Sequence, residues 1–132
     1  MPDDILIVGR ESILKKTLTS ALREANFEVT AVSDCTEALV KAADNKPDLV
    51  VMEVSLDNSD DVEICCRIHR DNSIPLVLIG GDSGDIVWSM MMTDAIADLY
   101  VTKPFSCIVL VAQIKAILRR YKILFNSRSQ HA

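Results

Sequence analysis

The sequence predicts a doubly wound α/β domain in which five parallel strands alternate with five helices. Short apolar runs recur along the chain, and the segments between them carry apolar residues at helical spacing. The expected strands are 5–8, 27–32, 49–54, 76–79 and 99–102. A continuous apolar run such as 5–8 is typical of a strand that is covered on both faces. The alternation therefore favours a (βα)5 sandwich, with right-handed connections and helices on both sides of one sheet.

Five segments have the spacing of amphipathic helices, and we expect them at 12–25, 36–44, 62–70, 86–96 and 106–124. Asp34 stands where it would cap the second helix, and Lys46-Pro47 ends that helix. After the fifth helix, residues 125–132 are expected to be a polar tail or the stub of a linker. The sequence shows no internal repeat and no second domain.

The composition argues against several classes of protein. Of the 132 residues, 49% are hydrophobic and 25% are charged, which suits a folded domain with a core. The net charge of −5 is unlike that of a nucleic-acid-binding domain, and we expect no direct nucleic-acid binding by this domain. No apolar stretch is long enough to span a membrane, and the acidic N-terminus is unlike a secretion signal, so we expect a cytoplasmic protein. The four cysteines lack metal-ligand spacing, and we expect reduced, mostly buried thiols.

The chemistry of such a fold belongs at the carboxyl ends of its strands, where ligands bind in open parallel sheets. In this chain few of the residues at those positions carry a reactive or charged group. The residues there are Gly9, Arg10, Glu11, Glu53, Gly80 and Lys103. One carboxylate level with a strand end, accompanied by two cations, suits an internal ion pair better than a metal site.

These residues lie within a chain that resembles the receiver domain of bacterial two-component response regulators over about residues 3–120. The most specific segments are ILIV at 5–8, PDLVVM at 47–52, IP at 74–75 and YVTKPF at 100–105. The resemblance implies a flavodoxin-like (CheY-like) fold with strand order 2-1-3-4-5 in a receiver-like domain of residues 1–124. The ending AILRR at 116–120 is similar to receivers that precede a winged-helix DNA-binding domain, which suggests such an output domain in a longer protein.

The resemblance also implies a chemistry that this chain has altered. Receivers accept a phosphoryl group on an aspartate at the end of the third strand, beside an acidic pair that helps hold Mg²⁺. Here Glu53 stands at the position of the aspartate, and Gly9 and Arg10 stand at those of the acidic pair. Gly80 replaces a Ser or Thr, and only Lys103 is retained. A permanent cation at position 10 disfavours a divalent metal, so we expect the Mg²⁺ site to be lost and no other cofactor or catalysis to replace it.

Two interpretations of Glu53 remain open. In the first, its side chain reaches Lys103 or Arg10 and forms a metal-free ion pair. In the second, Glu53 is a tolerated polar residue at a decayed site. Either gives a pseudo-receiver, and the alternative is a functional phosphoacceptor in a phosphorelay despite the altered site. Tyr100 occupies the position of the family's switch aromatic, but Gly80 offers it no hydroxyl partner.

The expected working surface is made by the fourth helix, the fifth strand and the fifth helix. Apolar side chains are too many there to face the sheet together, so some must face outward, and large exposed apolar patches mark interaction sites. The candidate interface residues are Trp88, Met91, Met92, Leu99, Val109 and Gln113. We expect a phosphorylation-independent interaction module that binds a protein partner, or a second copy of itself, through this surface.

Overall fold

The structure is a computed structural model that describes residues 2–10, 12–53, 64, 67–68, 73–80 and 97–131; for residue 12 and residues 125–131 the description is of the backbone. Five strands and three helices are defined within these ranges. They are β1 (Asp4–Val8), α1 (Ser12–Glu24), β2 (Glu28–Val32), α2 (Cys35–Asn45), β3 (Leu49–Glu53), β4 (Leu76–Gly80), β5 (Leu99–Thr102) and α5 (Cys107–His131). The helix expected at 86–96 lies outside the described residues, and of the helix expected at 62–70 three residues are described, all helical.

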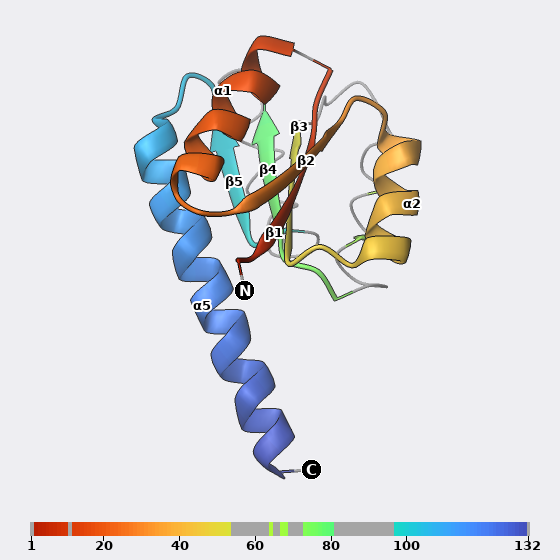
Figure 1. The fold of residues 1–132 in the computed structure, drawn as a ribbon, viewed down its shortest axis with the longest axis vertical. Coiled ribbons are helices and arrows are strands. Elements are labelled where there is room, and N and C mark those ends of the chain that lie inside the picture. The colour runs from red at the N-terminus through yellow and green to blue at the C-terminus, as the bar shows by residue number, and fades with distance from the viewer. Residues whose placement is uncertain are drawn as a thin grey trace.

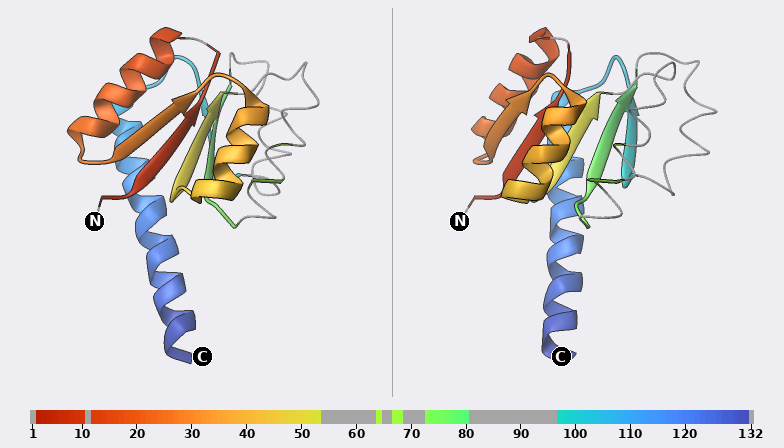
Figure 2. Two further views of the ribbon diagram at one scale, coloured as in Figure 1. Left: turned by 45° about the vertical axis from the view of Figure 1, so that its right-hand side comes forward. Right: turned by 90° about the vertical axis from the view of Figure 1, so that its right-hand side faces the viewer.

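The strands form one parallel sheet in the order β2-β1-β3-β4-β5, which confirms the order that the resemblance implied. Strand β3 is central, and the four residues from Leu49 to Met52 are fully buried, in keeping with the most apolar of the strand segments. Helices α1 and α5 cover one face of the sheet and α2 lies on the other (Figures 1 and 2). All strands point the same way, so their carboxyl ends meet at one edge of the sheet, which we call the upper edge. The opposite edge, where the strands begin, is called the base.

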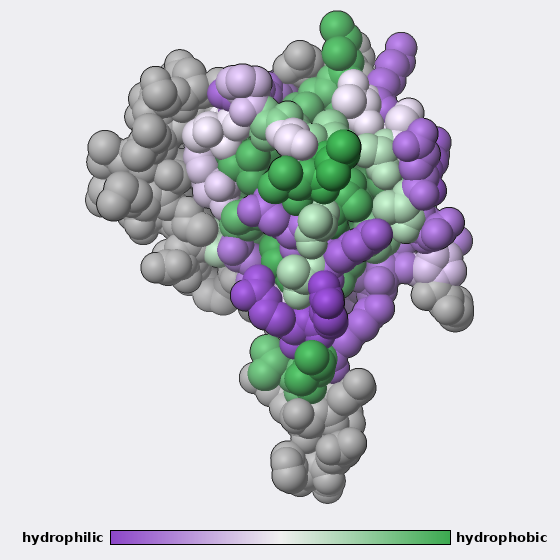
Figure 3. All heavy atoms as spheres, turned by 90° about the vertical axis from the view of Figure 1, so that its left-hand side faces the viewer, coloured by the Kyte–Doolittle hydropathy of each residue, from purple (hydrophilic) through white to green (hydrophobic). Residues whose placement is uncertain are grey.

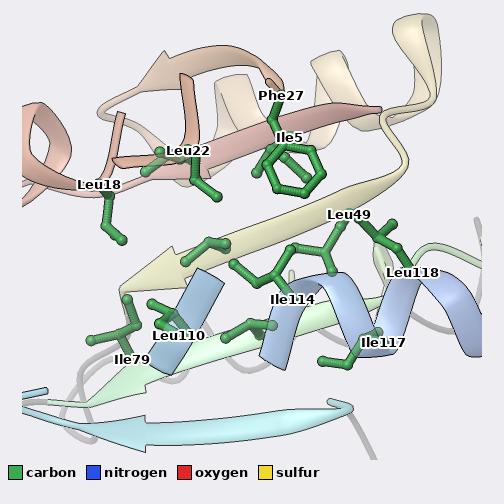
Figure 4. Close-up of a cluster of buried hydrophobic side chains, with 13 residues drawn as sticks. Ile5, Leu18, Leu22, Phe27, Leu49, Ile79, Leu110, Ile114, Ile117 and Leu118 are labelled. Atoms are coloured by element: carbon green, nitrogen blue, oxygen red, sulfur yellow. The ribbon is translucent and has the colours of Figure 1, made fainter. Parts of the chain in front are cut away.

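Alternate residues of each strand supply two separate cores. Ile5 and Ile7 of β1 belong to the cluster under α1 and α5, whereas Leu6 and Val8 belong to the cluster under α2. Figure 4 shows the first cluster, in which side chains of α1 and of α5 lie side by side against the central strands. Its contributors from α5 are Leu110, Ile114, Ile117 and Leu118. Leu110, Ile114 and Ile117 are buried and Val109 is 55% exposed, so part of the apolar surface of α5 faces outward, as expected.

Helix α2 begins and ends where the sequence indicated. The side chain of Asp34 accepts a hydrogen bond of 2.7 Å from the backbone N–H of Thr36, which satisfies a donor left free by the first turn. Lys46 closes the helix in the left-handed conformation, with φ of 45°, and Pro47 follows. These caps fix the short connection from α2 into β3, and with it the start of the central strand.

Helix α5 is longer than expected. The sequence placed its end at Leu124, but the helix runs for 25 residues to His131 and its last part projects beyond the base of the sheet (Figures 1 and 2). Residues 126–131 are polar, which suggested a tail, yet residues 125–131 include neither glycine nor proline to stop the helix. Among the described residues, no helix is both long and apolar enough to cross a membrane.

Candidate functional site

The upper edge of the sheet brings Gly9, Arg10, Glu53, Gly80 and Lys103 together, as the sequence predicted. Gly9 and Arg10 directly follow β1, Glu53 is the last residue of β3, and Gly80 is the last residue of β4. Lys103 directly follows β5. Glu11 lies outside the described residues. The site is therefore built from the ends of four strands, and the side chain of Glu53 stands at its centre.

Both carboxylate oxygens of Glu53 have partners within the chain. Oε2 forms an ion pair with Nζ of Lys103, and Oε1 accepts a hydrogen bond of 3.3 Å from the backbone N–H of Arg10. The Glu53 side chain is 15% exposed and that of Lys103 is 29% exposed, so water screens the pair only in part. Of the two interpretations of Glu53, the structure supports the ion pair and identifies Lys103 as its partner.

Lys103 is positioned by its own backbone as well as by its charge. Its N–H donates a hydrogen bond of 3.1 Å to the carbonyl of Gly80, which extends the β4–β5 ladder by one step. The peptide bond to Pro104 is cis. The ammonium group reaches across the end of β4 to the carboxylate of Glu53 at the end of β3.

Lys15 is a further cation beside the site, next to Gly9. It lies on the first turns of α1 and donates a hydrogen bond from Nζ to Oγ of Ser33, the residue that follows β2. A Cβ atom placed on Gly9 would lie 3.5 Å from Cγ of Lys15 and 3.6 Å from Oε1 of Glu53. The sequence did not predict this place for Lys15, because its contact with Ser33 depends on how α1 packs on the sheet.

The described residues do not fit the Mg²⁺ site that receivers use. In proteins Mg²⁺ is usually bound by one or two carboxylates and keeps several water molecules as its other ligands. Gly9 has no ligand atom and Arg10 brings a positive charge, while both oxygens of Glu53 are already engaged. Among the described residues, no group of three or more His, Cys, Asp or Glu side chains is placed to hold a metal ion.

The structure describes Tyr100, at the position of the switch aromatic, and some of the candidate interface residues. Tyr100 is half-buried on β5 and packs against the core under α2. Leu99 is half-buried against the other core, Gln113 is exposed, and the Val109 side chain is 55% exposed. Trp88, Met91 and Met92 lie outside the described residues.

Asp98, the residue before β5, is bound by its own chain. Its Oδ2 accepts a hydrogen bond of 2.9 Å from the N–H of Leu76, and its Oδ1 accepts one of 2.8 Å from the hydroxyl of Tyr121. Partial burial and the neighbouring carboxylate raise the pKa of Tyr121, so the phenol stays a proton donor. Asp98 therefore joins the starts of β4 and β5 to α5, a role that the sequence did not reveal because it depends on contacts 22 and 23 residues apart.

Comparison with known proteins agrees with this architecture. A model of the response regulator receiver domain matches residues 5–115. The chain belongs to the response regulator receiver domain family. As a receiver domain it is a module of two-component signalling, and it is a signalling domain rather than a classical enzyme.

The relatives of this receiver domain include regulators of transcription. The transcriptional regulatory protein CseB of Streptomyces avermitilis is 35% identical over 119 residues, which cover 89% of this chain and 49% of CseB. The DNA-binding response regulator MtrA of Mycobacterium tuberculosis is 32% identical over 122 residues, covering 91% of this chain and 52% of MtrA. The receiver domain thus spans about half the length of the curated relatives it matches.

Solved structures agree on the fold. A response regulator receiver domain protein from Clostridium thermocellum has a TM-score of 0.83 at 22% identity, covering 92% of this chain and 98% of that one. NtrX from Brucella abortus has a TM-score of 0.87 at 23% identity, and the matched region covers 98% of this chain and 30% of the NtrX chain. At these identities the likeness establishes the fold alone.

Proposed function

We propose that this receiver domain works without phosphorylation and serves as a protein-interaction module. The observation that carries the proposal is the ion pair between Glu53 and Lys103. In a phosphorylated receiver the lysine binds oxygens of the phosphoryl group, and here a carboxylate of the same chain already supplies an oxygen to it. The charge on Lys103 is thus compensated permanently, with no covalent step.

Electrostatics supports this proposal over the phosphoacceptor alternative. A phosphoryl donor carries negative charge, and its transfer needs a cation to screen the charge that develops. The acidic pair that would recruit Mg²⁺ is replaced by Gly9 and Arg10, and Glu53 would have to break its pairing with Lys103 before acting as a nucleophile. A phosphoryl group brings roughly two charges and three acceptor oxygens, so Glu53 is a partial substitute for it, not a full copy.

The proposal is tested by intact-mass spectrometry after incubation with acetyl phosphate and Mg²⁺. The wild type is expected to gain no phosphoryl group. The matched control is the triple variant Gly9→Asp, Arg10→Asp, Glu53→Asp, which restores the carboxylates at the family's positions. The contacts of a Cβ at position 9 are ordinary van der Waals distances, so the backbone there accepts a residue with a side chain. A phosphoryl adduct on the wild type that Glu53→Gln abolishes would establish the alternative instead.

We further propose that the start of α5 is the surface that binds a protein partner. Ile108 is 84% exposed and Val109 is 55% exposed, although both are large apolar side chains. Figure 3 shows apolar atoms gathered over the upper part of the face formed by α1 and α5, with a hydrophilic band below them. Exposed apolar area of this kind favours association with another protein.

For the chain as part of a longer protein, we propose a role in the regulation of transcription. The supporting observation is that CseB and MtrA, named as transcriptional and DNA-binding regulators, match this chain over about half of their length. A receiver that does not depend on phosphate would hold its output domain in one constant state. An output domain fused after residue 132 should then bind its target equally well with and without acetyl phosphate.

A further inference from the structure

A hollow lies at the base of the molecule, between α5, the turn that follows α1 and the segment that leads into β1. These three parts of the chain lie beside one another at the base in Figure 1. The hollow holds about 320 Å³, which falls within the usual range of small-molecule sites, about 300–1,000 Å³. Its lining includes none of the residues of the upper edge, so it is a second place at which this domain could bind a ligand.

Three basic side chains from one side of α5 line the hollow. Helix α5 carries five Lys and Arg residues and no Asp or Glu. The basic residues of α5 that line the hollow are Lys115, Arg119 and Lys122, which the helical repeat places on successive turns of the same side. Like charges at this spacing repel one another, so a negative group placed among them would be stabilised.

The lining of the hollow contains one carboxylate beside these cations. Asp3 forms an ion pair of 2.9 Å with Lys122. Among the described residues, no carboxylate lies within ion-pair distance of Lys115 or Arg119. The glutamates on either side of the turn after α1 do not line the hollow. Three cations and one carboxylate therefore give the lining a net charge of +2, which Lys115 and Arg119 carry.

The hollow also has an apolar wall. Ala25, Phe27 and Leu118 line it, and Phe27 and Leu118 are only 9% and 4% exposed, so this wall is anchored in the core. Asn26, in the turn after α1, also lines the hollow and has the left-handed conformation, with φ of 70°. Its side-chain amide offers both a donor and an acceptor. An apolar wall with a few polar and charged groups is the usual composition of a small-molecule site.

We propose that this hollow binds a small organic phosphomonoester, with the phosphoryl group between Lys115 and Arg119 and the organic group against the apolar wall. A phosphomonoester carries about −1.5 to −2 charges at neutral pH, which matches the net charge of the lining. The guanidinium of Arg119 has the geometry to donate two parallel hydrogen bonds to phosphoryl oxygens, and the ammonium of Lys115 adds charge and further donors. The bound dianion would also relieve the repulsion between these two side chains.

The charge distribution favours this ligand over other anions. A nucleic acid needs a basic surface that follows its backbone, whereas here the starts of β1 and β2 place Asp4 and Glu28 at the same base. A dicarboxylate divides its charge between two separate groups. Lys115 and Arg119 are four residues apart on a helix, with about 5–6 Å between their Cβ atoms, and so suit one compact dianion.

A ¹H–¹⁵N NMR titration of the ¹⁵N-labelled chain with phenyl phosphate tests the proposal, because it reports both the affinity and the place of binding. At about 0.1 M salt, where the Debye length is about 10 Å, saturable shifts are expected for the amides of Asn26, Lys115 and Arg119. The expected dissociation constant is about 1 mM or lower. Inorganic phosphate, which lacks the organic group, and phthalate, which carries two carboxylates on the same ring, should each bind at least about threefold more weakly.

Variants of exposed residues locate the site without disturbing the core. Arg119→Met should raise the dissociation constant of phenyl phosphate about tenfold or more, because it removes charge-assisted hydrogen bonds. Its matched control is Arg120→Met, which removes the same charge from an exposed neighbouring position that does not line the hollow, and which should change the constant by less than about twofold. Circular dichroism checks that both variants remain folded.

Three results would overturn the proposal. The first is the absence of saturable shifts up to about 10 mM phenyl phosphate. The second is a set of shifts that maps to the upper edge around Glu53 and Lys103, or that Arg119→Met leaves unchanged. The third is phthalate binding as tightly as phenyl phosphate, which would assign the hollow to carboxylates instead. All three are independent of whether Glu53 accepts a phosphoryl group.

Discussion

Replacing Lys103 by methionine removes the ammonium that neutralises Glu53 and keeps most of the length of the side chain. The carboxylate of Glu53 is then left with the backbone N–H of Arg10 as its partner in this part of the site, in surroundings that leave 15% of the side chain exposed. Ion pairs on the surface contribute about 0–1 kcal/mol, and breaking a fully buried pair costs about 3–5 kcal/mol. The pair is intermediate in exposure, so Lys103→Met should lower the free energy of unfolding by about 2 kcal/mol.

The interaction itself is isolated by a double-mutant cycle with Glu53→Gln. The amide of glutamine can still accept the hydrogen bond from Arg10, so this variant alone should cost about 1 kcal/mol. The double variant carries neither charge, so no charge is left unpaired. The coupling energy should be about 1–2 kcal/mol. Urea unfolding at neutral pH, followed by circular dichroism, measures all four proteins under the same conditions. Unchanged m-values would show that the denatured state is not the source of the effect. A coupling energy below about 0.3 kcal/mol would refute the reasoning that the pair stabilises the site.

Three further predictions concern the base of the domain and its helices. Tyr121→Phe removes the hydroxyl that donates to Asp98 and should lower the free energy of unfolding by about 1 kcal/mol, measured in urea. Asp34→Ala removes the cap of α2 and should cost about 1 kcal/mol in the same assay, whereas Asp34→Asn should cost much less. The pKa of Asp4 is higher in the folded protein than in the unfolded chain, where it is near 3.8. The contribution of Asp4 to the free energy of unfolding is therefore fully present below the unfolded pKa and is lost as the pH rises through the folded pKa. Asp4→Asn should therefore raise the melting temperature at pH 7 relative to the wild type, and the difference should shrink towards pH 4; a difference that grows in acid would contradict the assigned direction.

The fold and the main site residues were predictable because both follow from local patterns. Apolar runs alternate with amphipathic segments, and in a parallel sheet the residue after each run must lie at the same edge. That rule alone brought Glu53 and Lys103 together, although they are 50 residues apart. The choice of Lys103 over Arg10 as the ion-pair partner needed the structure, because both follow strands that end at this edge.

What the sequence did not predict depends on contacts between distant segments. Lys15 meets Ser33 only because α1 packs beside β2, and Tyr121 meets Asp98 only where α5 crosses the start of β5. The extension of α5 to His131 was hidden by its polar composition. The concentration of basic charge on that helix was present in the sequence, but the net charge of the whole chain obscured it.

The most direct test of the central claim is whether Glu53 accepts a phosphoryl group. Intact-mass spectrometry should be carried out on the wild type after incubation with acetyl phosphate and Mg²⁺, beside the variant that restores aspartate at positions 9, 10 and 53. The account predicts an unchanged mass for the wild type and an added phosphoryl group on the restored variant. A phosphoryl adduct on the wild type that maps to Glu53 would contradict it and would make this chain a phosphoacceptor.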